Sequence, residues 1–126
     1  MSSARPKSLL IVDDSRVSRM MIRTMIAARR PEWTLLEAAS GDEALQTLQQ
    51  QVPDYVTMDI NMPGTIGTDV AEQILRDHPG LRLVLFSANV QGAHQSRAAG
   101  MGAGFVHKPV SERSVEHALE LLERPA

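Results

Sequence analysis

The chain contains no cysteine among its 126 residues, which excludes disulfide bonds, zinc–thiolate sites and thiol nucleophiles. An excess of one charge is also missing: the formal net charge is −2 at pH 7, so there is no basic surface for nucleic acid or for an anionic membrane. No apolar run approaches the roughly 18 residues of a membrane span. Residues 1–7 lack the apolar core of a signal peptide. The sequence therefore predicts a cytoplasmic domain that binds neither nucleic acid nor membranes.

What is present fits one ordinary globular domain. Hydrophobic residues make up 43% of the chain and charged residues 22%, which is typical of folded proteins of this size. Residues 1–7 are polar and contain Pro6, so we predict a flexible N-terminal tail there. The remaining span, residues 8–124, is predicted to be a single domain without repeats or linkers.

Apolar runs alternate with segments of helical periodicity along the chain. Such alternation predicts a doubly wound α/β fold, with five parallel strands and helices on both faces of the sheet. The first run is apolar throughout, as in a central strand, and Glu37 in the second indicates an edge strand. The predicted strands are 8–14, 34–39, 54–60, 81–88 and 104–109, and the predicted helices are 15–30, one opening with a capping box at Ser40 and Glu43, 68–78, 91–101 and one from Ser111.

The helical segments also predict which side chains face the sheet. Residues 91–101 contain Gly92, Gly100 and few large apolar side chains, so this helix is expected to be weakly anchored. The inward positions predicted for the other helices are Val17, Met21, Ile22, Met25 and Ala28; Ala44, Leu45, Leu48 and Val52; Val70, Ile74 and Leu75; and Val115, Ala118, Leu119 and Leu122.

Polar side chains stand where the predicted strands end. They are Asp13 and Asp14, Asp59, Ser87 and Lys108. Because the carboxyl ends of parallel strands meet at one edge of a sheet, we expect these side chains to lie together. Three neighbouring carboxylates repel one another and need cations. Lys108 supplies one charge, and an oxygen-only donor set favours Mg²⁺, which takes carboxylates and phosphate oxygens. The sequence therefore predicts a site that handles phosphate.

Four motifs at these strand ends carry a resemblance to a known family. The motifs are "VDDS" at 12–15, "DINMP" at 59–63 followed by Gly67, "FSAN" at 86–89 and "FVHKP" at 105–109. In this order they resemble the CheY-like receiver domain of two-component response regulators, over residues 8–123. The resemblance implies a flavodoxin-like fold with strand order 2-1-3-4-5.

The resemblance implies a role for each matching site residue. Asp59 would be the phosphoacceptor, and Asp13 and Asp14 would hold Mg²⁺, or Mn²⁺ in its place, together with Asp59 and the backbone carbonyl of Asn61. Lys108, expected to precede a cis peptide bond to Pro109, would contact the phosphoryl oxygens, and Ser87 would hydrogen-bond the phosphoryl group.

Three further positions would act after phosphorylation. Asn61 and Asn89 would border the path of the hydrolytic water and tune the lifetime of the acyl phosphate. Phe105 would act with Ser87 as a switch, although a static core aromatic is the competing interpretation. The switch would reshape the face formed by the fourth helix, the fifth strand and the last helix, and so control a downstream protein partner.

The implied function is that of a signalling phosphoacceptor. A histidine kinase or a histidine phosphotransfer protein would supply the phosphoryl group, and the domain would catalyse only its own phosphoryl transfer and slow autodephosphorylation, as a monomer or weak dimer. One alternative is a receiver fragment of a longer regulator with a C-terminal output domain. Others are a degenerate scaffold, an aspartate-nucleophile phosphatase, which would need an acid where Asn61 stands, and a flavodoxin-like electron carrier, which would need a different loop at 13–18.

Two features depart from the family pattern. Ile66 precedes Gly67, where a small or polar residue is usual. The segment "AAGMGAGF" at 98–105 has one residue more than the usual spacing, which makes the register of Phe105 uncertain from sequence.

Overall fold

A computed structural model describes residues 6–62, 65–88 and 92–124. Its main sheet has five parallel strands in the order β2-β1-β3-β6-β7, which is the predicted order 2-1-3-4-5 of the main strands. The order confirms the doubly wound fold, and it puts β2, with Glu37, at an edge as predicted. The strands are β1 (Ser8–Val12), β2 (Thr34–Ala38), β3 (Tyr55–Asp59), β6 (Arg82–Ser87) and β7 (Gly104–His107).

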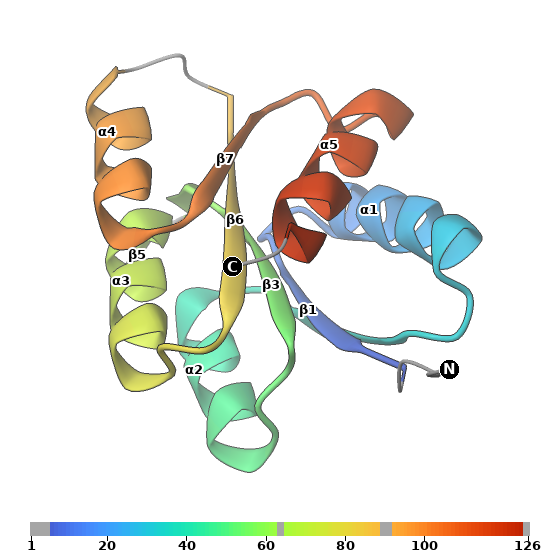
Figure 1. Ribbon diagram of the computed structural model, residues 1–126, viewed down its shortest axis with the longest axis horizontal. Helices are drawn as coiled ribbons and strands as arrows, with labels where there is room; N and C mark the ends of the chain where they lie inside the picture. The colour runs from blue at the N-terminus through green and yellow to red at the C-terminus, as the bar shows by residue number, and fades with distance from the viewer. Residues whose placement is uncertain (1–5, 63–64, 89–91, 125–126) are drawn as a thin grey trace.

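Five helices cover the two faces of this sheet (Figure 1). α1 and α5 lie on one face, over a core that includes Phe86 and Ile26, and α2, α3 and α4 lie on the other, over a core that includes Met58 and Ile74. Both faces of the central strands are therefore buried, as their apolar sequences require. The helices are α1 (Arg16–Arg29), α2 (Gly41–Gln50), α3 (Gly67–Asp77), α4 (Gly92–Met101) and α5 (Glu112–Glu123).

Serine hydroxyls fix the starts of three helices. The side chains of Ser15, Ser40 and Ser111 each accept a hydrogen bond from the backbone N–H three residues later, at 3.1 to 3.2 Å. Each bond satisfies one of the otherwise unpaired N–H groups of the first turn. In the capping box predicted at Ser40, the Glu43 carboxylate accepts from the N–H of Ala39 rather than from that of Ser40 itself.

Two of the predicted helix faces are wrong in part. Ile22 and Ile26 of α1 are buried, but Val17 is 63% exposed, Met21 is 38% exposed, and Ala28 is exposed as well. At 3.6 residues per turn, Val17 lies about 140° around the helix from Ile22 and so faces outward. Val52 is also exposed, because α2 ends at Gln50 and the chain beyond it is extended.

The other inward positions include the predicted core of α5, where Val115, Ala118, Leu119 and Leu122 are all buried. α4 has a single buried residue among those described, Ala98, which agrees with its predicted weak anchoring. Within residues 6–62, 65–88 and 92–124, none of the helices combines the length and the apolar character that crossing a bilayer would require.

The extra residue between α4 and β7 belongs to a helix C-terminal cap. Gly102 has a φ of 80°, a backbone conformation that glycine adopts without steric cost. The N–H of Gly102 donates to the carbonyl of Ala99, and that of Ala103 donates to the carbonyl of Ala98. These two bonds form a Schellman motif. The cap accommodates the departure in spacing and leaves Phe105 within β7, opposite Leu85 of β6.

One small element was not predicted. β4 (Asn61–Met62) pairs antiparallel with β5 (Thr65–Ile66) immediately after β3. This hairpin carries the chain from the end of β3 to the start of α3. Of the predicted N-terminal tail, residues 1–5 lie outside the described part of the chain.

Candidate functional site

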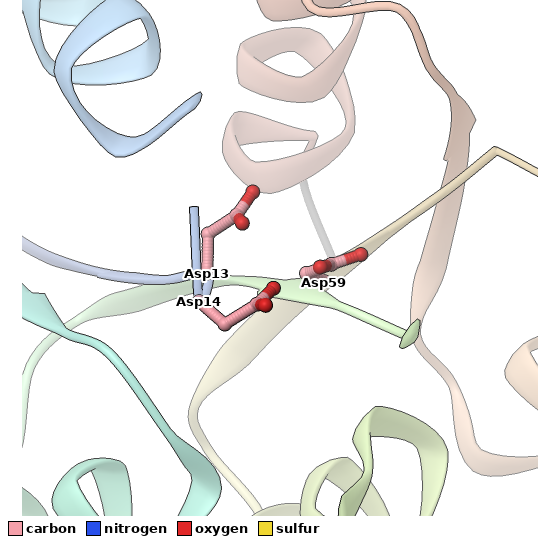
Figure 2. A group of neighbouring side chains, drawn as sticks. All are labelled: Asp13, Asp14 and Asp59. Carbon is pink, nitrogen blue, oxygen red and sulfur yellow. The ribbon is translucent and has the colours of Figure 1, made fainter. Parts of the chain in front are cut away.

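Three carboxylates gather where β1 and β3 end (Figure 2). Asp13 and Asp14 follow β1, and Asp59 is the last residue of β3. Each offers one oxygen, and these oxygens all lie within 4.8 Å of one another. Asp13 and Asp59 are only 1% and 4% exposed, whereas Asp14 is exposed. Oxygen donors at this spacing suit a hard divalent cation that reaches the site from the solvent side.

Lys108, which follows the edge strand β7, brings a positive charge into this cluster. Its Nζ lies 3.3 Å from Oδ2 of Asp13 and 3.4 Å from Oδ1 of Asp59. Its backbone N–H donates to the carbonyl of Ser87, and its peptide bond to Pro109 is cis, as predicted. One ammonium group thus contacts both buried carboxylates but offsets only part of their combined negative charge.

Hydrogen bonds with β2, with Ser15 and with α1 hold Asp13 in place. The Asp13 N–H donates to the carbonyl of Ala38 on β2, and Oδ1 accepts from the N–H of Ser15. The carbonyl oxygen of Asp13 accepts from Nη1 of Arg19 at 2.7 Å. Arg19 was not among the site residues predicted from the sequence. A signal was present, since long side chains near a helix start point back toward its N-terminus.

Asp59 has an unusual acidity. The pKa of its carboxyl is raised from 3.8 to about 6, chiefly by burial; the charge of Lys108 opposes the rise and the nearby Asp13 carboxylate adds to it. The N–H of Asn61, 3.3 Å from Oδ1, also lowers this pKa. Near neutral pH, Asp59 is therefore an ionised carboxylate in a poorly solvated position, which any added cation would stabilise.

Gly67 lets the start of α3 pack directly on the backbone of Asp59. Its N–H donates to the carbonyl of Ile60 at 2.8 Å. A Cβ atom at this position would lie 2.1 Å from the carbonyl oxygen of Asp59 and 2.7 Å from Cα of Ile60. Glycine is therefore required by close backbone approach. Ile66, the residue before it that departs from the family pattern, is 53% exposed, so its side chain does not have to fit a close backbone contact.

The remaining predicted residues lie at different distances from solvent. Ser87 is fully buried at the end of β6, and Asn61 is exposed in β4. Phe105 is partly buried against the core under α4, and its ring meets that of His107 edge-on, with centroids 5.3 Å apart. Asn89 lies outside the described residues.

Comparison with known proteins places the chain in a family. The family model of the response regulator receiver domain matches residues 9–120. The chemotaxis protein CheY of Thermotoga maritima is 35% identical over 119 residues, which cover 94% of this chain and 98% of that protein. The probable transcriptional regulatory protein TcrX of Mycobacterium tuberculosis is 32% identical over 126 residues, and this chain spans about half of it (52%).

The fold is shared with solved structures as well. A CheY-like receiver domain protein from Methanospirillum hungatei superposes with a TM-score of 0.83, covering 92% of each chain at 20% identity. At that identity the match shows the fold alone, whereas the family model and the CheY relative bear on the sequence itself. The chain belongs to the response regulator receiver domain family of two-component signalling systems.

Proposed function

We propose that Asp59 accepts a phosphoryl group from a phosphohistidine of a histidine kinase or a histidine phosphotransfer protein. The observation that carries this proposal is the position of Asp59, at the end of a buried strand, within 4.8 Å of the ligand oxygens of Asp13 and Asp14 and 3.4 Å from Nζ of Lys108. A stiff strand fixes the direction of the nucleophile. Lys108, together with a cation held by the aspartates, would counter the negative charge of the transferring phosphoryl group.

The donor set fits Mg²⁺, with Mn²⁺ as a substitute. Asp13, Asp14 and Asp59, together with the backbone carbonyl of Asn61, would hold the ion, and all four donors are oxygens. When bound, the ion neutralises negative charge that builds up on the oxygens of the transferring group.

The chain's own residues would then carry out an in-line transfer. A carboxylate oxygen of Asp59 forms a bond to phosphorus as the phosphorus–nitrogen bond to the donor histidine breaks, and the imidazole keeps the electron pair and takes up a proton. Lys108 lies close enough to Asp59 to offer its N–H groups to the phosphoryl oxygens. The product is an acyl phosphate, which water hydrolyses later. Asn61 and Asn89 would tune that lifetime.

Exposed apolar side chains beside the site support a protein phosphodonor. Val17, Met20 and Met21 are 63%, 53% and 38% exposed. They lie in the first two turns of α1, which begins immediately after the segment that carries Asp13 and Asp14. A phosphohistidine protein that docks here would bury apolar surface while its histidine reaches Asp59.

The direct test of the function uses a small phosphodonor. After incubation with acetyl phosphate and Mg²⁺, the intact protein is expected to gain the mass of one phosphoryl group. The Asp59→Asn variant, and the wild type with EDTA, are expected to gain none. Phosphorylation of the variant would contradict the assignment of Asp59, and steady turnover of phosphomonoesters would favour the aspartate-nucleophile phosphatase instead.

The proposed output is a change in the face formed by α4, β7 and α5. α4 has only Ala98 buried among its described residues, so little apolar contact opposes its rearrangement. Phe105 would turn into space that Ser87 vacates when its hydroxyl moves toward the phosphoryl group, a shift between two populated states.

This switch predicts a defined pattern of NMR changes. Beryllium fluoride, which mimics a phosphoryl group on aspartate, is expected to shift the amide signals of residues 92–123 with Mg²⁺ present. The amides of α2 are expected to change little and serve as the internal control. Shifts confined to the immediate neighbours of Asp59 would contradict the switch.

The domain is proposed to act as a non-enzymatic regulator in the cytoplasm, as a monomer or weak dimer, within residues 8–124. A second candidate is a receiver that controls a C-terminal output domain of a longer regulator. The observation that favours it is the match to TcrX, of which this chain spans 52%. The length of the full reading frame distinguishes the two.

A further inference from the structure

We propose that Arg19 is a positioning residue for the cation site, holding the peptide that joins Asp13 to Asp14. This inference rests on the proposed function, because it assigns Arg19 a role in assembling that same site. The contact that carries it is the hydrogen bond from Nη1 of Arg19 to the carbonyl oxygen of Asp13, at 2.7 Å. A charged donor at this distance makes a strong hydrogen bond.

The two aspartates depend on this bond to different degrees. Asp13 is held by its own carboxylate, which accepts from the N–H of Ser15 and from Lys108. Asp14 is exposed, and within the described part of the chain no hydrogen bond to its carboxylate is found. Its direction therefore follows from its backbone. The carbonyl of Asp13 and the N–H of Asp14 belong to one rigid peptide plane, so the bond from Arg19 orients Asp14 before any cation arrives.

Arg19 is itself held in position. Its Nε donates to Oε1 of Glu37 on β2 at 3.2 Å, and its side chain is 15% exposed. The guanidinium thus connects α1, the edge strand β2 and the β1–α1 segment. Arg23, one turn later on α1, donates to Oε2 of the same Glu37 and to the carbonyl of Leu35, and among the described residues no hydrogen bond from it to Asp13 is found. The chain therefore offers a matched pair of arginines that share Glu37, and of the two it is Arg19 that donates to Asp13.

The sign of the effect separates positioning from charge. Removing a positive charge near a cation site strengthens cation binding by Coulomb's law alone. Loss of positioning weakens it, because the cation must then order the aspartates itself. Positioning groups behind metal ligands typically contribute 10- to 100-fold in affinity. A loss of affinity in an arginine variant would therefore report positioning.

The experiment is calorimetric titration of Mg²⁺ into the whole chain at pH 7.5. Arg19→Ala is expected to weaken Mg²⁺ binding about tenfold, whereas Arg23→Ala is expected to bind as tightly as the wild type or slightly more tightly. In the metal-free proteins, the amide signal of Asp14 is expected to shift in Arg19→Ala and to stay in place in Arg23→Ala. Arg19→Lys keeps the charge without the planar fork that reaches Asp13 and Glu37 together, and an affinity between those of Arg19→Ala and the wild type is expected.

The outcomes distinguish this inference from the function on which it rests. If the wild type binds Mg²⁺ and the Arg19 variants bind it equally well, the positioning role is overturned and the proposed function stands. If the wild type binds no Mg²⁺, the cation site fails and the inference fails with it. If Arg19→Ala does not fold, Arg19→Lys decides the question, and wild-type affinity in that variant overturns the proposal. Equal losses in the Arg19 and Arg23 variants would also overturn it.

Discussion

Replacing Gly67 by alanine is expected to lower the free energy of unfolding by about 3 kcal/mol, at the upper end of the usual cost of overpacking. The added Cβ would lie 2.1 Å from the carbonyl oxygen of Asp59, and 2.9 Å from the carbonyl carbon of the same residue. Both contacts are with backbone, so no side-chain rotation relieves them. Either α3 must move away from β3, or the end of β3 that carries the acceptor must move.

Gly100 provides the matched control for this substitution. It lies within α4 and is exposed. Apart from its chain neighbours and the adjoining backbone of α4, no heavy atom of the described residues lies within 4 Å of the position where a Cβ would be added. Alanine there is expected to raise the free energy of unfolding by up to about 1 kcal/mol, because alanine favours the helix over glycine. Urea denaturation of both variants measures the difference. Equal stabilities of the two variants would contradict this prediction, because they would show that α3 and β3 can move apart at little cost in free energy.

Gly67→Ala is also expected to slow phosphorylation of Asp59, by more than the loss of stability alone would explain. The N–H of Gly67 donates to the carbonyl of Ile60, and the added Cβ would clash with the backbone of Asp59. A displacement of about 1 Å at a reacting group is enough to slow a reaction a hundredfold. In folded Gly67→Ala protein, phosphorylation by acetyl phosphate is therefore expected to be much slower than in Gly100→Ala.

The sequence predicted the fold and the cluster of strand-end side chains well because both depend on local rules. The segments 8–14 and 54–60 each contain a run of four mostly apolar residues, 9–12 and 55–58, without alternation, which favours central strands buried on both faces. Once the strands are parallel, their carboxyl ends must meet at one edge. That requirement brings Lys108 to Asp13 across 95 residues of sequence separation, although no local pattern relates the two positions.

The features that the sequence did not reveal depend on tertiary packing. The face of α1 was misassigned at Val17 because a helix with apolar residues on several sides has no single inward stripe, and only the packing against α5 and the sheet selects one. Arg19 was missed because its partner is a backbone carbonyl, which carries no residue identity. Both features lie next to the site. Residues at a functional site often depart from the patterns that folding alone would produce, so rules for folding predict them poorly.

The raised pKa of Asp59 makes stability depend on pH in a predictable direction. In the unfolded chain its carboxyl ionises near its ordinary value of 3.8, but in the folded protein it keeps its proton up to about pH 6. Between these values the folded state binds more protons than the unfolded state, so the free energy of unfolding falls as pH rises. The pKa difference corresponds to about 2–3 kcal/mol, fully present below about pH 4 and lost above about pH 7.

The Asp59→Asn variant isolates this contribution, because an amide of nearly the same shape does not titrate. In EDTA, the variant is expected to gain stability relative to the wild type as pH rises from about 4 to about 7, by about 2–3 kcal/mol in total. Urea denaturation of both proteins across this range measures the difference, in which the titration of groups distant from Asp59 cancels. A difference that stays constant with pH would show that Asp59 ionises in the folded protein as it does in water.

At neutral pH, adding Mg²⁺ is expected to remove much of the difference in the free energy of unfolding between Asp59→Asn and the wild type. A ligand that binds only the folded state stabilises it by mass action, and the wild type presents three carboxylates to the ion where Asp59→Asn presents two. Mg²⁺ is therefore expected to raise the free energy of unfolding of the wild type at pH 7.5 more than that of the variant, and to do so less at pH 5, where a proton competes for Asp59. The buried carboxylate that weakens the metal-free fold would then be the group that couples cation binding to the chemistry of the site.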